Sequence, residues 1–314
     1  AGASREECKQ SGNYPSDESK YLPLIRDFSQ KLLQPHSSAV NHVVLSYFNS
    51  HKIAFSDEGG SLKPVEAFMQ LEKLDSSKHN IETLCEHAWV VYKDMPKNYD
   101  NFIYDGIYLN LFVFFTEQFG LGLGVPMNAG KRFARVLSLG DTVINLNYDI
   151  AFDLALKQAG IPFCYAPEQR DNCVLVLKPH GSINCYVNHL SGDFYFEDPD
   201  KISGSVGRRE KGGTFQPYGT IIPPQLNKTY EQHPFARMIL KTKRPFTPEI
   251  VTFWGVGLTS SDVDLLNIYR EATRKTKEIE FINPSDEVCM VAEKLLYRKV
   301  HHFRSLEEWE YDRK

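Results

Sequence analysis

The sequence has 314 residues, 42% of them hydrophobic and 24% charged, which suffices for one large domain or two modest ones. The net charge of −4 and the pI of about 6.2 argue against a nucleic-acid surface and against an anionic-membrane binder. No signal peptide is recognisable, and the longest apolar run, 108–115, is too short to span a bilayer. We therefore expect a cytoplasmic protein with no membrane partner and no direct nucleic-acid binding.

The cysteines are spread along the chain. They are Cys8, Cys85, Cys164, Cys173, Cys185 and Cys289. None forms a C-x-x-C pair, which argues against a structural zinc site. We expect reduced thiols and no bound metal.

The chain begins with a turn of small residues, Ala1-Gly2-Ala3-Ser4. When such a turn follows a strand, its backbone N–H groups can approach a phosphate closely. No strand precedes it here, so the alternative is an ordinary frayed terminus. These four residues alone do not decide between the two.

The next hundred residues have mainly helical periodicity. Helices are predicted over 22–32, 81–92, 102–119 and 131–139. The short runs 43–47 and 53–55 are compatible with helix or strand. This much helix is too long for a simple crossover between strands, so we predict an inserted helical subdomain over 21–137.

The rest of the chain alternates strands with helices. Strands are predicted over 142–146, 161–165, 174–177, 251–254, 279–282 and 300–303. Helices are predicted over 150–158, 234–241, 265–273, 286–297 and 306–311. Between them, 190–197 and 204–217 indicate a hairpin and a long loop. The alternation predicts an α/β fold, a Rossmann-like doubly wound parallel sheet formed by 1–20 and 138–314.

Four predicted strands end in polar or glycine-containing turns. The turns are Asn147-Tyr148-Asp149, His180-Gly181-Ser182, Gly255-Val256-Gly257 and Asn283-Pro284. Each turn has a bland interpretation, as a helix cap, a buried core histidine, tight packing or a plain turn. In an open α/β sheet, however, ligands bind at the carboxyl edge of the strands. Together the turns indicate phosphate binding at glycine-containing helix N-termini, and chemistry by an amide, a carboxylate and an imidazole.

The ordered set of motifs resembles the sirtuin superfamily, whose members consume NAD. Ala1 to Ser4 resemble the end of its glycine-rich phosphate loop. Asn147-Tyr148-Asp149 matches the asparagine-x-aspartate motif, and His180-Gly181 matches the histidine-glycine motif. Gly255-Val256-Gly257 resembles the glycine-threonine-serine turn, and Asn283 resembles the residue that holds the adenosine ribose.

Departures from the family pattern favour one branch. The zinc module of the protein deacylases is absent, because only Cys185 and Cys289 follow His180. The tyrosine at position 148, the helical insertion and the stretch 221–224 resemble the sirtuin-like domains of bacterial anti-phage systems, which hydrolyse NAD when triggered. Gly257 replaces the serine of the family turn, so one hydroxyl contact is lost.

The resemblance implies NAD+ as the substrate, with nicotinamide and ADP-ribose, or a cyclic form of it, as products. Catalysis would fall to Asn147, Asp149 and His180. Asn147 would position a water or the ribose hydroxyls, Asp149 would contact the nicotinamide amide, and His180 would act as a general base. Cofactor-binding residues would be Ala1, Gly2, Ala3, Ser4, Gly255, Val256, Gly257 and Asn283.

The resemblance also implies control, because an unregulated NAD hydrolase would kill its own cell. We expect a homo-oligomer, or a partner that senses infection, such as a DNA-translocating ATPase, a short Argonaute or a cyclic-nucleotide sensor. The alternatives are a catalytically silent module that binds NAD or ADP-ribose, a zinc-free deacylase, and an α/β domain whose helical insert only mediates assembly.

Overall fold

The structure is a computed structural model, and it describes part of the chain. The described residues are 38–55, 63–92, 128–168, 170–188, 193–201, 208–210, 213–216, 221–222, 230, 234–241, 248–258 and 262–313. The predicted phosphate turn at Ala1 to Ser4 and the predicted helices over 22–32 and 102–119 lie outside these residues.

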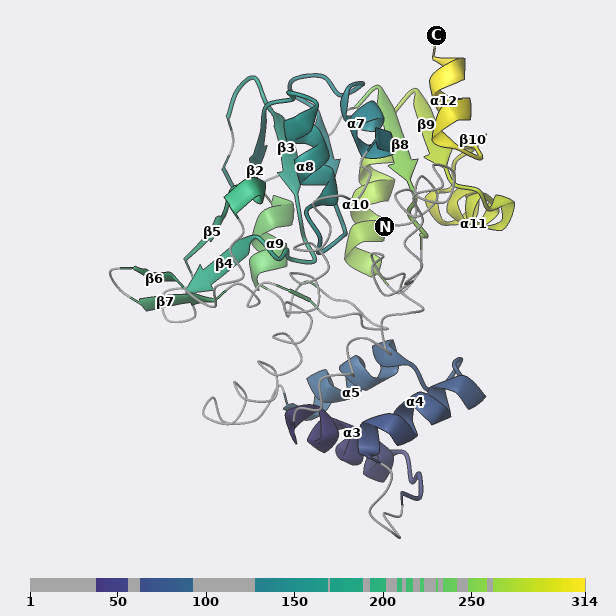
Figure 1. The fold of residues 1–314 in the computed structure, drawn as a ribbon. Helices are drawn as coiled ribbons and strands as arrows, with labels where there is room; N and C mark the ends of the chain where they lie inside the picture. The colour runs from purple at the N-terminus through teal and green to yellow at the C-terminus, as the bar shows by residue number, and fades with distance from the viewer. Residues whose placement is uncertain are drawn as a thin grey trace.

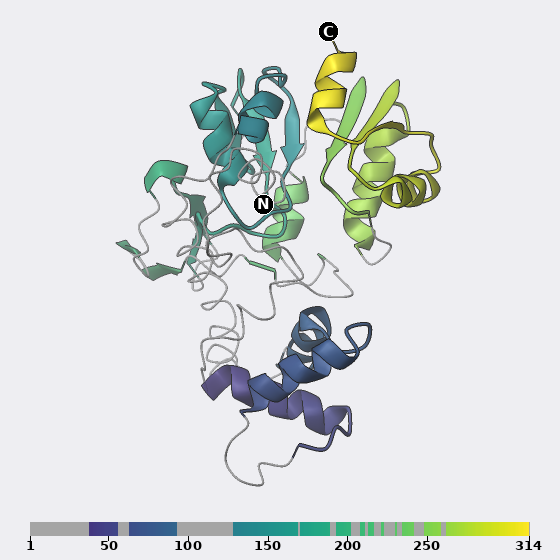
Figure 2. The same cartoon turned by 45° about the vertical axis from the view of Figure 1, so that its right-hand side comes forward.

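Two parallel sheets lie side by side in the upper part of the molecule (Figures 1 and 2). The first has the order β1-β3-β2, formed by Thr142–Ile144, Val174–Leu177 and Phe163–Tyr165. The second has the order β10-β9-β8, formed by His301–Phe303, Glu278–Ile282 and Ile250–Trp254. Every neighbouring pair within them runs parallel. The predicted α/β class with parallel strands is confirmed.

Strand β3 shows why helices cover both faces of its sheet. All four of its residues are buried, as expected for a parallel strand between two helical layers. Leu175 and Leu177 face a core that includes residues of α9 (Pro234–Lys241), α10 (Val263–Thr273) and α11 (Asp286–Leu296). Val174 and Val176 face a core with α7 (Asn128–Ala134) and α8 (Ala151–Gln158). The alternation of side chains along one strand therefore places helices on opposite sides, which is a doubly wound arrangement.

A third, antiparallel sheet follows β3 in the sequence. Its order is β5-β4-β7-β6, formed by Phe194–Phe196, Cys185–Asn188, Gly213–Gln216 and Arg208–Glu210. A short 3-10 helix, η4, covers Pro199–Lys201. We predicted a hairpin and a long loop here and missed β4, because its apolar run is only three residues long and directly follows a polar turn.

In the lower part of Figure 1, α4 (Pro64–Leu74) and α5 (Ile81–Tyr92) both pack against α3 (Ser38–Ser50). The ambiguous run 43–47 is helical within α3, whereas 53–55 is neither helix nor strand. Helix α4 was not predicted, although it has a proline at its start. Helix α7 packs against α8 instead and begins three residues before the predicted helix. Among the described helices, none has the length and apolarity to cross a membrane.

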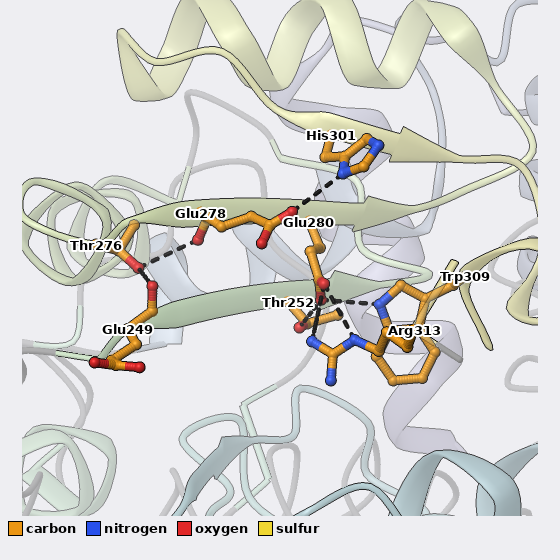
Figure 3. Close-up of polar contacts among 8 residues, drawn as sticks. All are labelled: Glu249, Thr252, Thr276, Glu278, Glu280, His301, Trp309 and Arg313. Atoms are coloured by element: carbon orange, nitrogen blue, oxygen red, sulfur yellow. Dashed lines mark hydrogen bonds and ion pairs between the residues drawn. The ribbon is translucent and has the colours of Figure 1, made fainter. Parts of the chain in front are cut away.

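The C-terminal helix α12 (Leu306–Asp312) is fixed to the second parallel sheet through the buried carboxylate of Glu280, which is 3% exposed. Thr252 on β8 donates its hydroxyl to this carboxylate at 2.6 Å, and the Trp309 indole N–H donates at 2.8 Å (Figure 3). The Arg313 guanidinium contacts both carboxylate oxygens at 2.8 Å and lies 4.4 Å from the centre of the Trp309 ring. The charge is thus paired and hydrogen-bonded, which makes its burial tolerable.

Candidate functional site

The turn after β1 is shaped by a residue that the sequence analysis did not select. Asn145 is buried, and its backbone N–H donates to the Leu177 carbonyl at 2.8 Å, while its side-chain oxygen accepts from the Asn147 N–H at 3.0 Å. Asn147 is exposed. Asp149 is 7% exposed and accepts from the Ala151 N–H at 3.0 Å, at the first turn of α8. Asp149 therefore does help to start the helix, whereas Asn147 lies at the surface.

A buried ion pair, Lys178 with Asp153, contacts the backbone of this turn. The Lys178 ammonium lies 2.7 Å from Asp153 Oδ2 and 2.5 Å from the Asp149 carbonyl oxygen, and both side chains of the pair are 0% exposed. Burial raises the pKa of the Asp153 carboxyl above its ordinary value, and the attraction of Lys178 opposes that rise. The cation at the end of β3 thereby fixes the main chain of Asp149.

The imidazole of His180 lies at the carboxyl end of β3 and is 6% exposed. Its Nδ1 is 3.2 Å from the Leu146 carbonyl oxygen, an acceptor only, so Nδ1 carries the proton of the neutral ring. Its Nε2 is 2.8 Å from the Tyr230 hydroxyl and 3.3 Å from Asp262 Oδ2. The Tyr230 hydroxyl is also 3.3 Å from that carboxylate oxygen. Nε2 is therefore the basic atom, and a hydroxyl and a carboxylate face it.

His180 can accept a proton, and Tyr230 and Asp262 can stabilise its protonated ring. Burial, reinforced by the Asp262 charge, raises the pKa of Tyr230 well above its ordinary value, so the phenol keeps its proton. The phenol can donate to neutral Nε2. Once Nε2 is protonated, it can donate to Asp262, while the phenol proton turns to the carboxylate. The negative charge of Asp262 then stabilises the imidazolium.

Tyr230 and Asp262 were not among the predicted site residues. Asp262 directly precedes α10, at its N-cap position. Tyr230 stands outside any periodic segment, and its backbone N–H donates to Asp264 at 2.6 Å, which ties it to the start of α10. Nothing in the sequence around Tyr230 indicates that it contacts His180.

The turns after β1 and β3 are joined through the backbone at Ile222. The Tyr148 hydroxyl donates to the Ile222 carbonyl at 2.5 Å, and the Ile222 N–H donates to the His180 carbonyl at 2.9 Å. The Ile183 N–H and the Ser182 hydroxyl both donate to the Tyr148 carbonyl, at 3.0 Å and 3.3 Å. The predicted motifs around positions 148 and 180 therefore form one hydrogen-bonded unit.

The glycine turn after β8 leaves open space above its backbone. Gly255 has a φ of +63°, a conformation that favours glycine, and its N–H donates to the Ile282 carbonyl at 3.0 Å. A Cβ built at Gly255 or Gly257 would meet no atom within 4 Å. The partly buried side chain of Val256 packs against the core that contains Leu175 and Leu177. A ligand could therefore approach this backbone closely, as a phosphate-binding turn requires.

Asn283, after β9, is engaged in local structure. Its N–H donates to the Phe303 carbonyl at 2.9 Å, and its side-chain oxygen accepts from the Ser285 N–H at 3.0 Å, near the start of α11. Its carbonyl lies 2.7 Å from His302 Nε2. This geometry holds the turn in place, and a ribose-binding role for the side chain stays a prediction.

The structure thus brings the turn over 147–149 together with His180, and it brings Asp262 from the β8–α10 connection onto the same histidine. The glycine turn and Asn283 follow adjacent strands of the second parallel sheet. Within the described part of the chain, no group of three or more histidine, cysteine, aspartate or glutamate side chains could hold a metal ion.

No protein-family model matches the sequence, and no curated protein matches it. Similar solved structures include two mutants of a Sir2 homologue in complex with ADP-ribose. One is 13% identical, covering 78% of this chain and 74% of that chain at a TM-score of 0.33. The other is 12% identical, covering 92% and 94% at a TM-score of 0.32. A Sir2 homologue in complex with NAD is 11% identical, covering 88% and 93% at a TM-score of 0.28. These TM-scores are low, and the roles proposed below rest on the residues of this chain and their contacts.

Proposed function

We propose that this chain hydrolyses NAD+ at the bond between nicotinamide and ribose, giving nicotinamide and ADP-ribose or a cyclic form of it. The observation that carries the proposal is the environment of His180, whose basic Nε2 faces Tyr230 and Asp262 beside the turn that bears Asn147. The ordered motifs that resemble the sirtuin superfamily support NAD+ as the ligand. The open backbone at the glycine turn after β8 fits a diphosphate.

Nicotinamide in NAD+ is a cationic pyridinium and leaves as a neutral base, so this hydrolysis needs no general acid. The site must hold the glycoside, stabilise an oxocarbenium-like transition state and place a water. In our proposal Asn147 positions that water or the ribose hydroxyls, and Asp149 contacts the nicotinamide amide. His180 accepts a proton from the ribose hydroxyl or the water.

Tyr230 and Asp262 complete this assignment. The phenol donates to Nε2 before the reaction, and therefore competes with the substrate for the basic atom. As His180 gains a proton, Asp262 becomes its counter-ion. Both residues touch the base from the α10 side and keep its ring oriented, while the Leu146 carbonyl holds the opposite nitrogen.

The phosphates would be bound by Ala1, Gly2, Ala3, Ser4, Gly255, Val256 and Gly257, and the adenosine ribose by Asn283. We further propose that 21–137 is an inserted helical subdomain, and that the protein acts in the cytoplasm as an NAD-depleting effector of anti-phage defence. Its trigger would be self-assembly or a partner that senses infection. The motif resemblance supports this context.

The test is incubation of the purified chain with NAD+, with and without candidate partners, followed by chromatography of nicotinamide and ADP-ribose. His180→Ala and Asn147→Ala should each lower nicotinamide release by about 10²- to 10⁴-fold without unfolding the protein. His301→Ala is the matched control, since that histidine is exposed and paired with Glu278 on the second sheet. If both site variants turned over NAD+ like the wild type, the assignment would be wrong.

Other outcomes identify the alternatives. O-acyl-ADP-ribose formed from an acyl peptide, detected by mass spectrometry, would indicate a deacylase. Tight NAD+ or ADP-ribose binding without turnover under every condition would indicate a silent binding module. The absence of any nucleotide binding would leave an α/β domain that only assembles.

A further inference from the structure

Two cysteine side chains meet between neighbouring parallel strands. Cys164 is the middle residue of β2, and it pairs in register with Leu175 of β3. Cys173 stands two residues before Leu175, so the alternation of side chains puts both cysteines on the same face of the sheet. Their sulfur atoms are 2.8 Å apart, and each residue is 4% exposed. The two sulfurs are therefore direct neighbours in the main core.

Cys173 lies next to an exposed turn at the amino end of β3. Cys173 directly follows the exposed residues Asp171 and Asn172, and its sulfur contacts the Arg170 carbonyl at 3.2 Å. The thiolate is the nucleophilic form of a thiol.

We propose that Cys164 and Cys173 form a redox-modification site, in which a hydroperoxide converts the two thiols into a disulfide. The Cys173 thiolate attacks the hydroperoxide, the O–O bond breaks, and an alcohol, or water from hydrogen peroxide, leaves. The Cys164 thiolate then attacks the sulfenic sulfur, the S–S bond forms, the S–O bond breaks and water leaves. The two thiols lose two electrons, the hydroperoxide gains them, and the thiol protons end on the two leaving oxygens.

The position of this bond defines its effect. It would tie β2 to the amino end of β3, whereas His180 follows the carboxyl end of β3. Closing a loop of about ten residues restricts the unfolded chain, so the oxidised protein should melt roughly 5 °C above the reduced protein. The modification therefore acts on stability and does not depend on the proposed NAD+ hydrolysis.

The chain allows a direct test. The purified protein is treated with graded hydrogen peroxide, alkylated, and digested with trypsin without reduction. Because trypsin cuts after Arg170 but not between Lys178 and Pro179, Cys164 ends in one peptide, and Cys173 and Cys185 share another. Fragmentation of the joined peptides by tandem mass spectrometry then shows which of these two cysteines is bonded to Cys164. We expect these two peptides to be joined, to separate on reduction with dithiothreitol, and to be accompanied by the rise in Tm.

The other described cysteines serve as internal controls, because Cys85, Cys185 and Cys289 lie on α5, β4 and α11. Cys289→Ser should keep the joined peptides and the Tm rise, whereas Cys164→Ser and Cys173→Ser should lose both. Cys164→Ala replaces the serine variant if a hydroxyl at that core position unfolds the protein. Separate, fully alkylated peptides after oxidation would overturn the proposal. So would sulfinic acid at Cys173 without a joined peptide, or a bond from it to another cysteine.

Discussion

The buried pair of Lys178 and Asp153 allows a sharp stability prediction. In the variant Lys178→Met, a side chain of similar length replaces the ammonium and leaves the carboxylate of Asp153 without its cation. The Asp149 carbonyl also loses its donor. The perturbation thus removes one partner of a pair in which both side chains are 0% exposed.

The magnitude follows from that burial. Removal of one partner from a buried ion pair typically costs about 3–5 kcal/mol, because an uncompensated charge is left in a low-dielectric interior. An exposed lysine gives the matched control. Lys157 contacts Asp198 and Asp200 at 2.6 and 2.5 Å, but its side chain is 39% exposed, so Lys157→Met should cost less than about 1 kcal/mol.

The assay is equilibrium unfolding in urea, followed by tryptophan fluorescence at several pH values. The folded-state pKa of Asp153 is raised above its ordinary 3.8, so its contribution to stability is fully present below that value and is lost as pH rises through the folded pKa. Without the opposing lysine this pKa rises further. The deficit of Lys178→Met relative to the wild type should therefore grow as pH increases from 4 toward 8.

A second variant checks the reasoning. Asp153→Leu combined with Lys178→Met removes both charges, and it should be more stable than Lys178→Met alone. The reasoning is refuted if Lys178→Met costs no more than Lys157→Met, or if its deficit is the same at every pH.

Further substitutions test other contacts. Glu280→Gln should lower the free energy of unfolding by about 1–3 kcal/mol in urea titrations, because the Arg313 guanidinium and the buried Trp309 indole lose a charged acceptor. Asp262→Asn removes the counter-ion of the His180 imidazolium. It should lower the pKa of His180, measured by NMR of the ring protons, whether or not NAD+ turns over. Gly255→Ala should cost about 1 kcal/mol through its positive φ, whereas Gly257→Ala should be nearly neutral, and equal costs would contradict this.

The parallel sheets could be predicted because their strands carry strong local signals. The run 174–177 is continuously apolar, and such a run between polar turns is typical of a strand buried on both faces. Where strands run parallel, their carboxyl ends share one edge, so the turns at 147–149 and at His180 could be expected to meet there. Their hydrogen-bonded connection agrees with that expectation.

The remaining site features depend on tertiary contacts without a local pattern. Tyr230 reaches His180 across fifty positions in the sequence, and nothing in its neighbours marks it. The sequence pattern places Asn145 in the strand, whereas its side chain shapes the following turn. Helix α4 does carry a signal, since Pro64 stands at its first turn and Glu66 caps the backbone of Lys63, but its apolar pattern is short.

The connection through Ile222 has a consequence for how the sequence can vary. Ile222 joins Tyr148 to His180 through its main-chain atoms alone. The residue is 2% exposed, and its side chain lies in the core. Any apolar residue of suitable size can therefore keep the two motifs at the same spacing. Proline cannot, because it has no N–H to donate to the His180 carbonyl. Homologous chains could thus diverge at this position and still present the same pair of motifs.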